Sequence, residues 1–328
     1  MKRKVLFGFL ISAVCLYLSL RGVDWKAVGS ALAQAHYIYI VPNGALILAS
    51  MWLRAIRWRY MTDAVKPGIG LHSLFASTMI GFMVNNVLPL RLGEIARPFS
   101  LSHKEGISRS AAFATIVVER VFDALSLLLV SGLLLLLAPV LIEGEPRLVQ
   151  AAYIALTLHV VALGSLFLLK VKTEASLRWI RRLCGVFPDR VGERVVQLAT
   201  QFTTGLGVLQ NARSLVAVVG WSLAVWAVVG FSNYFIFLAF DLSVPWYAPY
   251  VVLVIVSLGV MLPSAPGYVG TFQYFTVAAL KIFGIPASVG LSFSLVLHAG
   301  NYVPVTLLGL YYLRREHFSL RQLEEEAS

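Results

Sequence analysis

Long apolar runs separated by short polar segments recur along the whole chain. The runs long enough to cross a bilayer as helices are 5–20, 38–53, 111–137, 151–169, 215–240 and 287–313. A transmembrane helix needs about 20 mostly apolar residues, and within lipid a chain satisfies its backbone polar groups only as a helix or a closed barrel. The pattern predicts an all-α integral membrane protein with about six spanning helices.

Two further apolar runs, 71–90 and 247–262, lead into residues that break a helix. The expected hairpin breaks are Pro89, Gly93, Pro263, Pro266, Gly267 and Gly270. Proline removes a backbone donor and clashes with the preceding turn, whereas glycine lets the chain turn sharply. Returning hairpins would also keep Arg91 and Arg97 on the same face as the other basic segments. We therefore predict two re-entrant helical hairpins; the alternative, with both runs spanning once, gives eight spans.

The two hairpin regions resemble each other, as repeat 1 at about 71–137 and repeat 2 at about 246–313. Each has a Leu-Pro break, then a Gly-Ile pair, then a long apolar run. Counted from the Gly-Ile pair, Arg120 and His298 share one offset, and Asp123 and Asn301 share another. The predicted topology places the two units in opposite orientations, which is the plan of many secondary transporters.

Composition supports this class. The 328 residues are 59% hydrophobic and 13% charged, whereas a soluble domain carries about 25% charged residues. No polar stretch is long enough for a soluble domain; the longest, 170–213, is a basic connector expected in the cytoplasm. We therefore expect a single polytopic membrane domain over residues 1–328.

The net charge of +11 indicates positive-inside topology and attraction to anionic lipids. We expect a bacterial inner cell membrane protein with both termini in the cytoplasm. No basic folded module indicates nucleic-acid binding. Cys15 and Cys184 show no metal-ligand spacing and no basis for a disulfide, and we expect no metal and no cofactor.

Three charged residues lie well inside the apolar run 111–137: Glu119, Arg120 and Asp123. An ionised side chain at the centre of a membrane helix costs roughly 2.5–3.5 kcal/mol. Glu119 and Asp123 are four residues apart, so they share a helix face. Three interpretations remain open: a relay for protons or headgroups, a buried ion network that fixes helix packing, and side chains that extend to the membrane interface.

Arg91, Glu94 and Arg97 lie at the first hairpin break. A broken helix exposes backbone amides that favour an anion, and the two arginines add full positive charges. We expect a phosphate headgroup to bind here, between the hairpins. The alternative is that both arginines are positive-inside residues at a helix end.

The remaining candidates for substrate binding are Asn86, Gln273, His298 and Asn301. The two asparagines fit either as ligands or as hydrogen-bonding contacts between helices. His298 fits either proton coupling or a structural role, because a histidine ring can serve both.

Other polar segments have simpler interpretations. Residues 21–37 read as a polar loop, and the basic residues after the run 38–53 are expected to mark a cytoplasmic face. These basic residues are Arg54, Arg57, Arg59 and Lys66. Trp52, Trp58 and Tyr60 suit an interfacial aromatic belt.

At these motifs the chain resembles the flippase-like membrane domain of lysylphosphatidylglycerol synthases and their stand-alone relatives. The motifs are NNVLPLRLGEIAR at 85–97, Glu119, Arg120 and Asp123, LPSAPGYVGTFQ at 262–273 and FGIP at 283–286. The resemblance implies lipid translocation between leaflets, and it places the first polar cluster at Arg91, Glu94, Arg97, Glu119, Arg120 and Asp123. It would also lead one to expect Glu at position 273 and Arg at position 298, where this chain has Gln273 and His298.

The leading hypothesis is a transporter, not an enzyme, that moves an anionic phosphate-bearing lipid of the phospholipid or polyprenyl-phosphate type between leaflets. One alternative is a membrane-embedded lipid or glycosyl transferase. Another is a non-transporting partner of an envelope lipid-modifying enzyme. The expected partner is an anionic membrane lipid; a lipid-modifying enzyme and a homo-oligomer are further candidates.

Overall fold

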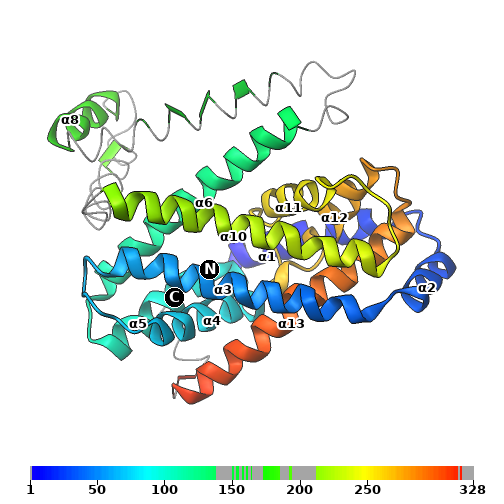
Figure 1. The fold of residues 1–328 in the computed structure, drawn as a ribbon, viewed down its shortest axis with the longest axis horizontal. Helices are drawn as coiled ribbons and strands as arrows, with labels where there is room; N and C mark the ends of the chain where they lie inside the picture. Colours follow the sequence, from blue (N-terminus) through cyan, green and yellow to red (C-terminus); the bar gives the residue numbers. More distant parts are fainter. Residues whose placement is uncertain are drawn as a thin grey trace.

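The computed structural model describes residues 2–137, 173–184, 212–316 and 318–319, together with isolated positions between 150 and 193. Every element of these residues is helical (Figure 1). The α-helices are α1 (Lys2–Leu20), α2 (Trp25–Gln34), α3 (Ile40–Thr62), α4 (Leu71–Val87), α5 (Gly93–Glu105), α6 (Arg109–Leu137), α8 (Thr173–Cys184), α10 (Ala212–Ala239), α11 (Ala248–Gly259), α12 (Thr271–Lys281) and α13 (Ala287–Arg315). Three short 3-10 turns are η1 (Tyr37–Tyr39), η2 (Pro89–Arg91) and η4 (Pro266–Tyr268).

Four described helices are long and apolar enough to cross a membrane. They are Tyr37–Thr62, Arg109–Leu137, Arg213–Ala239 and Ala287–Arg315. The pair Val5–Leu20 and Trp25–Gln34, bent by 87°, adds a fifth if it forms one span. The protein is thus an all-helical, multi-pass membrane protein. The expected span 151–169 and most of the connector 170–213 lie outside the described residues.

The prediction of a polar loop over 21–37 was wrong, because α2 occupies most of it. Asp24 caps this helix by accepting a hydrogen bond from the amide of Lys26 at 2.8 Å, which satisfies an otherwise unpaired donor of the first turn. Val28 then buries its side chain in a cluster with Val277 and Leu291. A short amphipathic segment can therefore read as a loop when its apolar face is narrow.

The first hairpin consists of α4 and α5, which pack against each other. α4 ends at Val87, and η2 begins at Pro89. Gly81 sits where the two helices approach most closely: a methyl group there would lie 2.7 Å from Cβ of Arg97 and 2.9 Å from the carbonyl oxygen of Gly93. Only a residue without a side chain permits this approach.

The second hairpin consists of α11 and α12, joined through η4. Each hairpin is followed by a turn at a glycine with positive φ, Gly106 at 65° and Gly284 at 72°. Each turn leads into a helix of 29 residues, α6 or α13. These two long helices run in opposite directions along the long axis of the molecule (Figure 1).

The tips of the two hairpins are in contact. Arg91 donates from Nη2 to the carbonyl oxygen of Val260 at 2.6 Å, just beyond the end of α11. Beside this contact, the Tyr302 hydroxyl of α13 (Ala287–Arg315) donates to the carbonyl oxygen of Asn86 at 3.2 Å, near the end of α4. Both carbonyls lie at broken helix ends, where the helix itself offers no partner.

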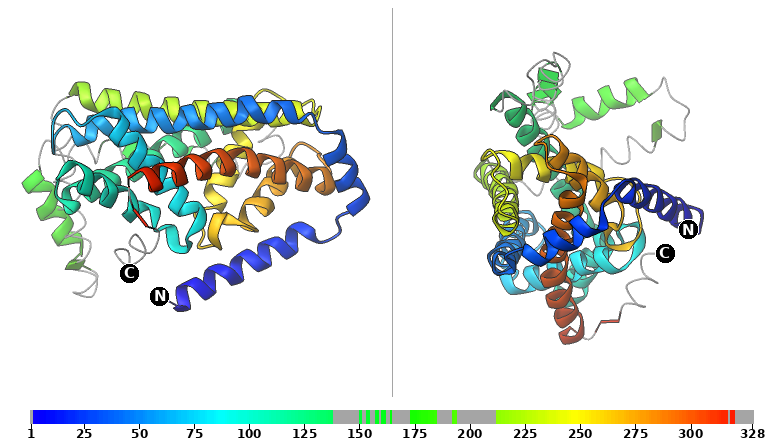
Figure 2. Two further views of the ribbon diagram at one scale, coloured as in Figure 1. Left: turned by 90° about the horizontal axis from the view of Figure 1, so that it is seen from below. Right: turned by 90° about the vertical axis from the view of Figure 1, so that its right-hand side faces the viewer.

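Helices α3 and α10 lie side by side along one edge of the bundle, and α1 lies toward the opposite side (Figure 2). α1 contacts the second hairpin through Ser12, whose hydroxyl accepts the amide of Ala265 at 2.7 Å. The largest hydrophobic core cluster joins α3, α4 and α6 with parts of α10 and α13. This packing places the polar side chains of α3, α5 and α6 next to one another.

Candidate functional site

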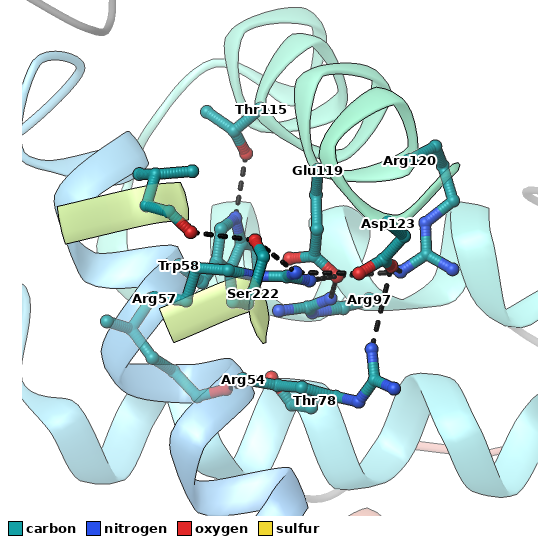
Figure 3. A network of polar contacts seen from close by, with 12 residues as sticks. Arg54, Arg57, Trp58, Thr78, Arg97, Thr115, Glu119, Arg120, Asp123 and Ser222 are labelled. Atoms are coloured by element: carbon teal, nitrogen blue, oxygen red, sulfur yellow. Dashed lines mark hydrogen bonds and ion pairs between the residues drawn. The ribbon is translucent and has the colours of Figure 1, made fainter. Parts of the chain in front are cut away.

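Six charged side chains from three helices meet inside the bundle (Figure 3). We call them the arginine cluster: Arg54 and Arg57 of α3, Arg97 of α5, and Glu119, Arg120 and Asp123 of α6. The hairpin brings α5 against α6, and α3 packs against both α6 and α10. The cluster thus depends on the hairpin fold and cannot form from one helix alone.

One oxygen of Glu119 serves three arginines. Its Oε1 lies 2.7 Å from Arg97, 2.7 Å from Arg120 and 3.1 Å from Arg57. Its other carboxylate oxygen is buried and has no hydrogen-bond partner. A carboxylate can accept bonds on both oxygens, so this arrangement leaves acceptor capacity unused while donors compete for a single atom.

Asp123 completes the ring of ion pairs. It lies 2.6 Å from Arg57, 3.0 Å from Arg120 and 3.5 Å from Arg54. Ser222 of α10 accepts a further bond from Arg57 Nη1 at 2.9 Å. Glu119 and Asp123, spaced four residues apart on one face of α6, therefore bridge arginines that arrive from two other helices.

Aromatic rings lie against the planar faces of two guanidinium groups. The guanidinium carbon of Arg97 lies 3.9 Å from the ring centre of Trp58, and that of Arg54 lies 5.2 Å from Phe82. Trp58 is fully buried and donates from Nε1 to Thr115 at 2.8 Å. An interfacial position for Trp58 was therefore wrong, because its indole nitrogen has a buried partner and its ring stacks on a cation.

Positive charge exceeds negative charge in the cluster. Four arginines face two carboxylates, which leaves an excess of two positive charges. Buried guanidinium nitrogens without a hydrogen-bond partner are Nε of Arg54, Nε and Nη2 of Arg57, Nε and Nη2 of Arg97, and Nε of Arg120. Leaving buried donors unpaired and charges uncompensated is costly, so the cluster is suited to an anion.

The cluster is closed on one side and more open on the other. The side chains of Arg57 and Glu119 are 0% exposed, whereas that of Arg120 is 37% exposed. Arg91 and Glu94 form a partly exposed ion pair at 3.9 Å. An approaching group would therefore meet Arg120 before it reached the buried arginines.

The structure brings four of the predicted residues together: Arg97, Glu119, Arg120 and Asp123. The other two charged candidates, Arg91 and Glu94, lie at the hairpin tip. Asn86 donates to the hydroxyl of Thr306 at 2.9 Å and so ties α4 to α13.

Sequence reasoning missed Arg54 and Arg57 as site residues. Both were assigned to a cytoplasmic face, yet both are buried in the bundle. The physical reason is that α3 continues to Thr62 as one helix and packs against α4, α6 and α10 over that extension. The sequence holds one signal for this: Arg54 and Arg57 are three residues apart and therefore share a helix face. In the structure Arg59 points away from that face and is exposed.

The corresponding region of the second repeat is uncharged. Gln273 Nε2 lies 3.0 Å from His298 Nδ1, and its Oε1 accepts the amide of Gly270 at 2.8 Å. The His298 ring stacks on Phe272 at 4.4 Å. Asn301 has a buried side-chain oxygen without a partner. Gln273 and His298 thus form a separate polar contact, in which Gln273 caps α12. Neither of them, nor Asn301, is in ion-pair contact with the arginine cluster.

Comparison with known proteins identifies related sequences. A family model described as "Lysylphosphatidylglycerol synthase TM region" matches residues 5–309. A "UPF0104 membrane protein" of Methanothermobacter thermautotrophicus is 24% identical, over 94% of this chain and 95% of that protein. A "UPF0104 membrane protein" of Methanocaldococcus jannaschii is 26% identical, over 80% of each chain.

One relative carries a more specific name. "Glycosyltransferase AglD" of Haloferax volcanii is 25% identical, over 99% of this chain. The chain spans only 56% of that protein's length. No solved structure matches.

Proposed function

The chain belongs to the family of lysylphosphatidylglycerol synthase TM regions, and from that membership and the arginine cluster we propose that it moves an anionic, phosphate-bearing lipid between membrane leaflets. The observation that carries the proposal is the excess of positive charge among buried arginines that have unpaired donors. Guanidinium groups bind phosphate oxygens through paired hydrogen bonds. A headgroup would supply the missing negative charge while its tails stay in lipid.

The proposed topology has about six spans and two re-entrant hairpins in an inverted repeat. Two observations support it: the same order of hairpin, glycine turn and long helix occurs twice, and α6 and α13 run in opposite directions (Figure 1). Broken helices that line a polar site are typical of transporters built from inverted repeats. We further propose that both termini are cytoplasmic in a cell membrane. The matched relatives named above are archaeal proteins, so a bacterial membrane is our own suggestion.

The contact between hairpin tips offers a route for the headgroup. Arg91 and Tyr268 both adopt positive φ, at 57° and 59°, which is strained for residues with side chains. The guanidinium carbon of Arg91 also lies 6.0 Å from the centre of the Tyr268 ring. We propose that separating these tips opens a path from Arg120 toward the buried arginines, and that closing them excludes lipid.

Lipid translocation can be tested in liposomes that contain the purified protein and a fluorescent phosphate-bearing lipid. A membrane-impermeant quencher reports how fast lipid leaves one leaflet. Wild-type protein should accelerate exchange, Arg97→Gln should slow it by at least about tenfold if one charge-assisted bond is lost, and Arg59→Gln should leave it unchanged. Wild-type rates equal to those of protein-free liposomes would refute the proposal.

A second candidate is a lipid or glycosyl transferase, because one relative is named a glycosyltransferase. Incubation with a polyprenyl-phosphate sugar and analysis of the lipid products tests it. Sugar transfer that is lost in Arg97→Gln would favour this candidate. A non-transporting partner of an envelope enzyme would instead leave both assays inactive for folded wild-type protein.

A further inference from the structure

We propose that the arginine cluster selects a headgroup with two negative charges, namely a lipid phosphomonoester, over a phosphodiester with one. The inference rests on the proposed lipid-binding function and specifies the ligand of the same site. It concerns the charge and the number of free oxygens on the phosphate, and both can be compared with the cluster.

The charge excess is unchanged when the neighbouring ion pair is counted with the cluster. The core holds four arginines and two carboxylates. Adding the neighbouring pair of Arg91 and Glu94 gives five arginines and three carboxylates, and the excess is again two. Lys66 and Lys104 pair elsewhere, with Glu105 and Glu316. Among the described residues, no further carboxylate is in ion-pair contact with the four arginines of the core.

Water cannot readily balance this charge at the deepest residues. Arg57 and Arg97 are 0% and 3% exposed, yet each keeps two nitrogens without a hydrogen-bond partner. Both arginines share their carboxylates with other guanidinium groups, so the two carboxylates do not balance all four buried positive charges. A ligand with one negative charge would leave one arginine uncompensated, whereas a ligand with two would balance the cluster.

The sharing of Glu119 Oε1 by three guanidinium groups also matters for the number of bonds. Each guanidinium carries five N–H donors. A phosphomonoester offers three free oxygens that accept hydrogen bonds strongly, one more than a phosphodiester. Three guanidinium groups now compete for Glu119 Oε1. The third phosphate oxygen would provide one of them with a separate acceptor.

The test compares dioleoyl phosphatidic acid, a monoester, with dioleoyl phosphatidylglycerol, a diester with the same tails. Purified full-length protein is mixed with both lipids, and bound lipid is counted by native mass spectrometry. The second pKa of a phosphomonoester is about 6, and the pH of the buffer is kept well above this value. One additional charge-assisted hydrogen bond is expected to favour phosphatidic acid by roughly tenfold.

Variants separate charge selection from general lipid binding. Arg120→Gln lowers the excess to one positive charge, and Arg120 is partly exposed, so its loss should spare the fold. In Arg120→Gln, the preference for phosphatidic acid over phosphatidylglycerol should fall to roughly threefold or less. If Arg120→Gln is unstable, Arg54→Gln should show the same fall. In Arg59→Gln the preference should stay unchanged. An unchanged preference in folded Arg120→Gln and Arg54→Gln would overturn the inference.

The outcomes distinguish the inference from the function beneath it. Equal binding of both lipids, or stronger binding of phosphatidylglycerol, refutes selection by charge and leaves lipid transport intact. Binding of neither lipid, with no translocation in liposomes, refutes the proposed function. Glycerol phosphate serves as a soluble monoester: if it displaces phosphatidic acid at equal concentration, the site takes a free phosphate ester and not a lipid.

Discussion

Arg57 offers the sharpest test of the arginine cluster. Its guanidinium pairs with Asp123 at 2.6 Å and with Glu119 at 3.1 Å, and it donates to Ser222 at 2.9 Å. Arg57→Met keeps an unbranched, apolar side chain and removes all three contacts. The two carboxylates then keep only Arg54, Arg97 and Arg120 as partners.

The expected loss of folding free energy follows from burial. Removing one partner from a buried ion pair typically costs about 3–5 kcal/mol when the other charge is left unpaired. Asp123 keeps Arg120 at 3.0 Å and Arg54 at 3.5 Å, so the loss expected for Arg57→Met lies near the lower end of that range. Arg59→Met is the matched control: it lies on the same helix, two residues further on, and is exposed. Surface substitutions of this kind usually change stability by less than about 0.5 kcal/mol.

A double-mutant cycle isolates the pair itself. Asp123→Leu alone should cost more than Arg57→Met alone, since it raises the positive excess from two charges to three, whereas Arg57→Met lowers it to one. The double variant removes one charge of each sign and keeps the charge excess, so it should be more stable than the sum of the two losses by about 2–3 kcal/mol.

Unfolding in mixed detergent micelles, followed by tryptophan fluorescence or circular dichroism, measures these differences. We expect wild type and Arg59→Met to be equally stable, and Arg57→Met to be clearly less stable than both. The double variant should lose less stability than the sum of the losses of Arg57→Met and Asp123→Leu. If Arg57→Met unfolded with Arg59→Met, or if the two losses were simply additive, the ion pair would contribute nothing and the reasoning would be refuted.

Three other substitutions test the hairpins. Gly81→Ala forces a methyl group to 2.7 Å from Cβ of Arg97 and should destabilise the folded protein by about 1–3 kcal/mol or more. Gly220→Ala in α10 is the control, because nothing lies within 4 Å of the added carbon. It should be neutral or stabilising in the same unfolding assay. Gln273→Glu places a carboxylate at a residue that is 4% exposed and should lower the free energy of unfolding by several kcal/mol. Adding His298→Arg should restore much of that stability. If it restores none, the two side chains do not face each other. Arg91→Ala removes the link between hairpin tips and should cost about 1 kcal/mol, with Arg91→Lys losing less; equal unfolding of Arg91→Ala and wild type would argue against the contact.

The sequence by itself determined the long described helices and the first helix break, although it missed the shorter α2. Run length and hydrophobicity set the long helices, because the backbone has no other way to satisfy its polar groups in lipid. Helix α4 ends at Val87, two residues before Pro89, since proline acts on its own turn and needs no distant partner. The charged face of α6, with Glu119 and Asp123 one turn apart, was likewise readable from spacing alone.

Only the tertiary structure decided which charges meet. The spacing of Arg54 and Arg57 places them on one helix face, but at the end of an apolar run such a face can be either solvated or buried. Their position depends on α4, α6 and α10 packing around α3, so the partners come from segments far apart in the chain. Likewise, the pairing of Gln273 with His298 depends on how α12 packs on α13. Whether a charge is solvated or buried is a property of its neighbours, and for that reason the excess of positive charge becomes visible only in the folded bundle.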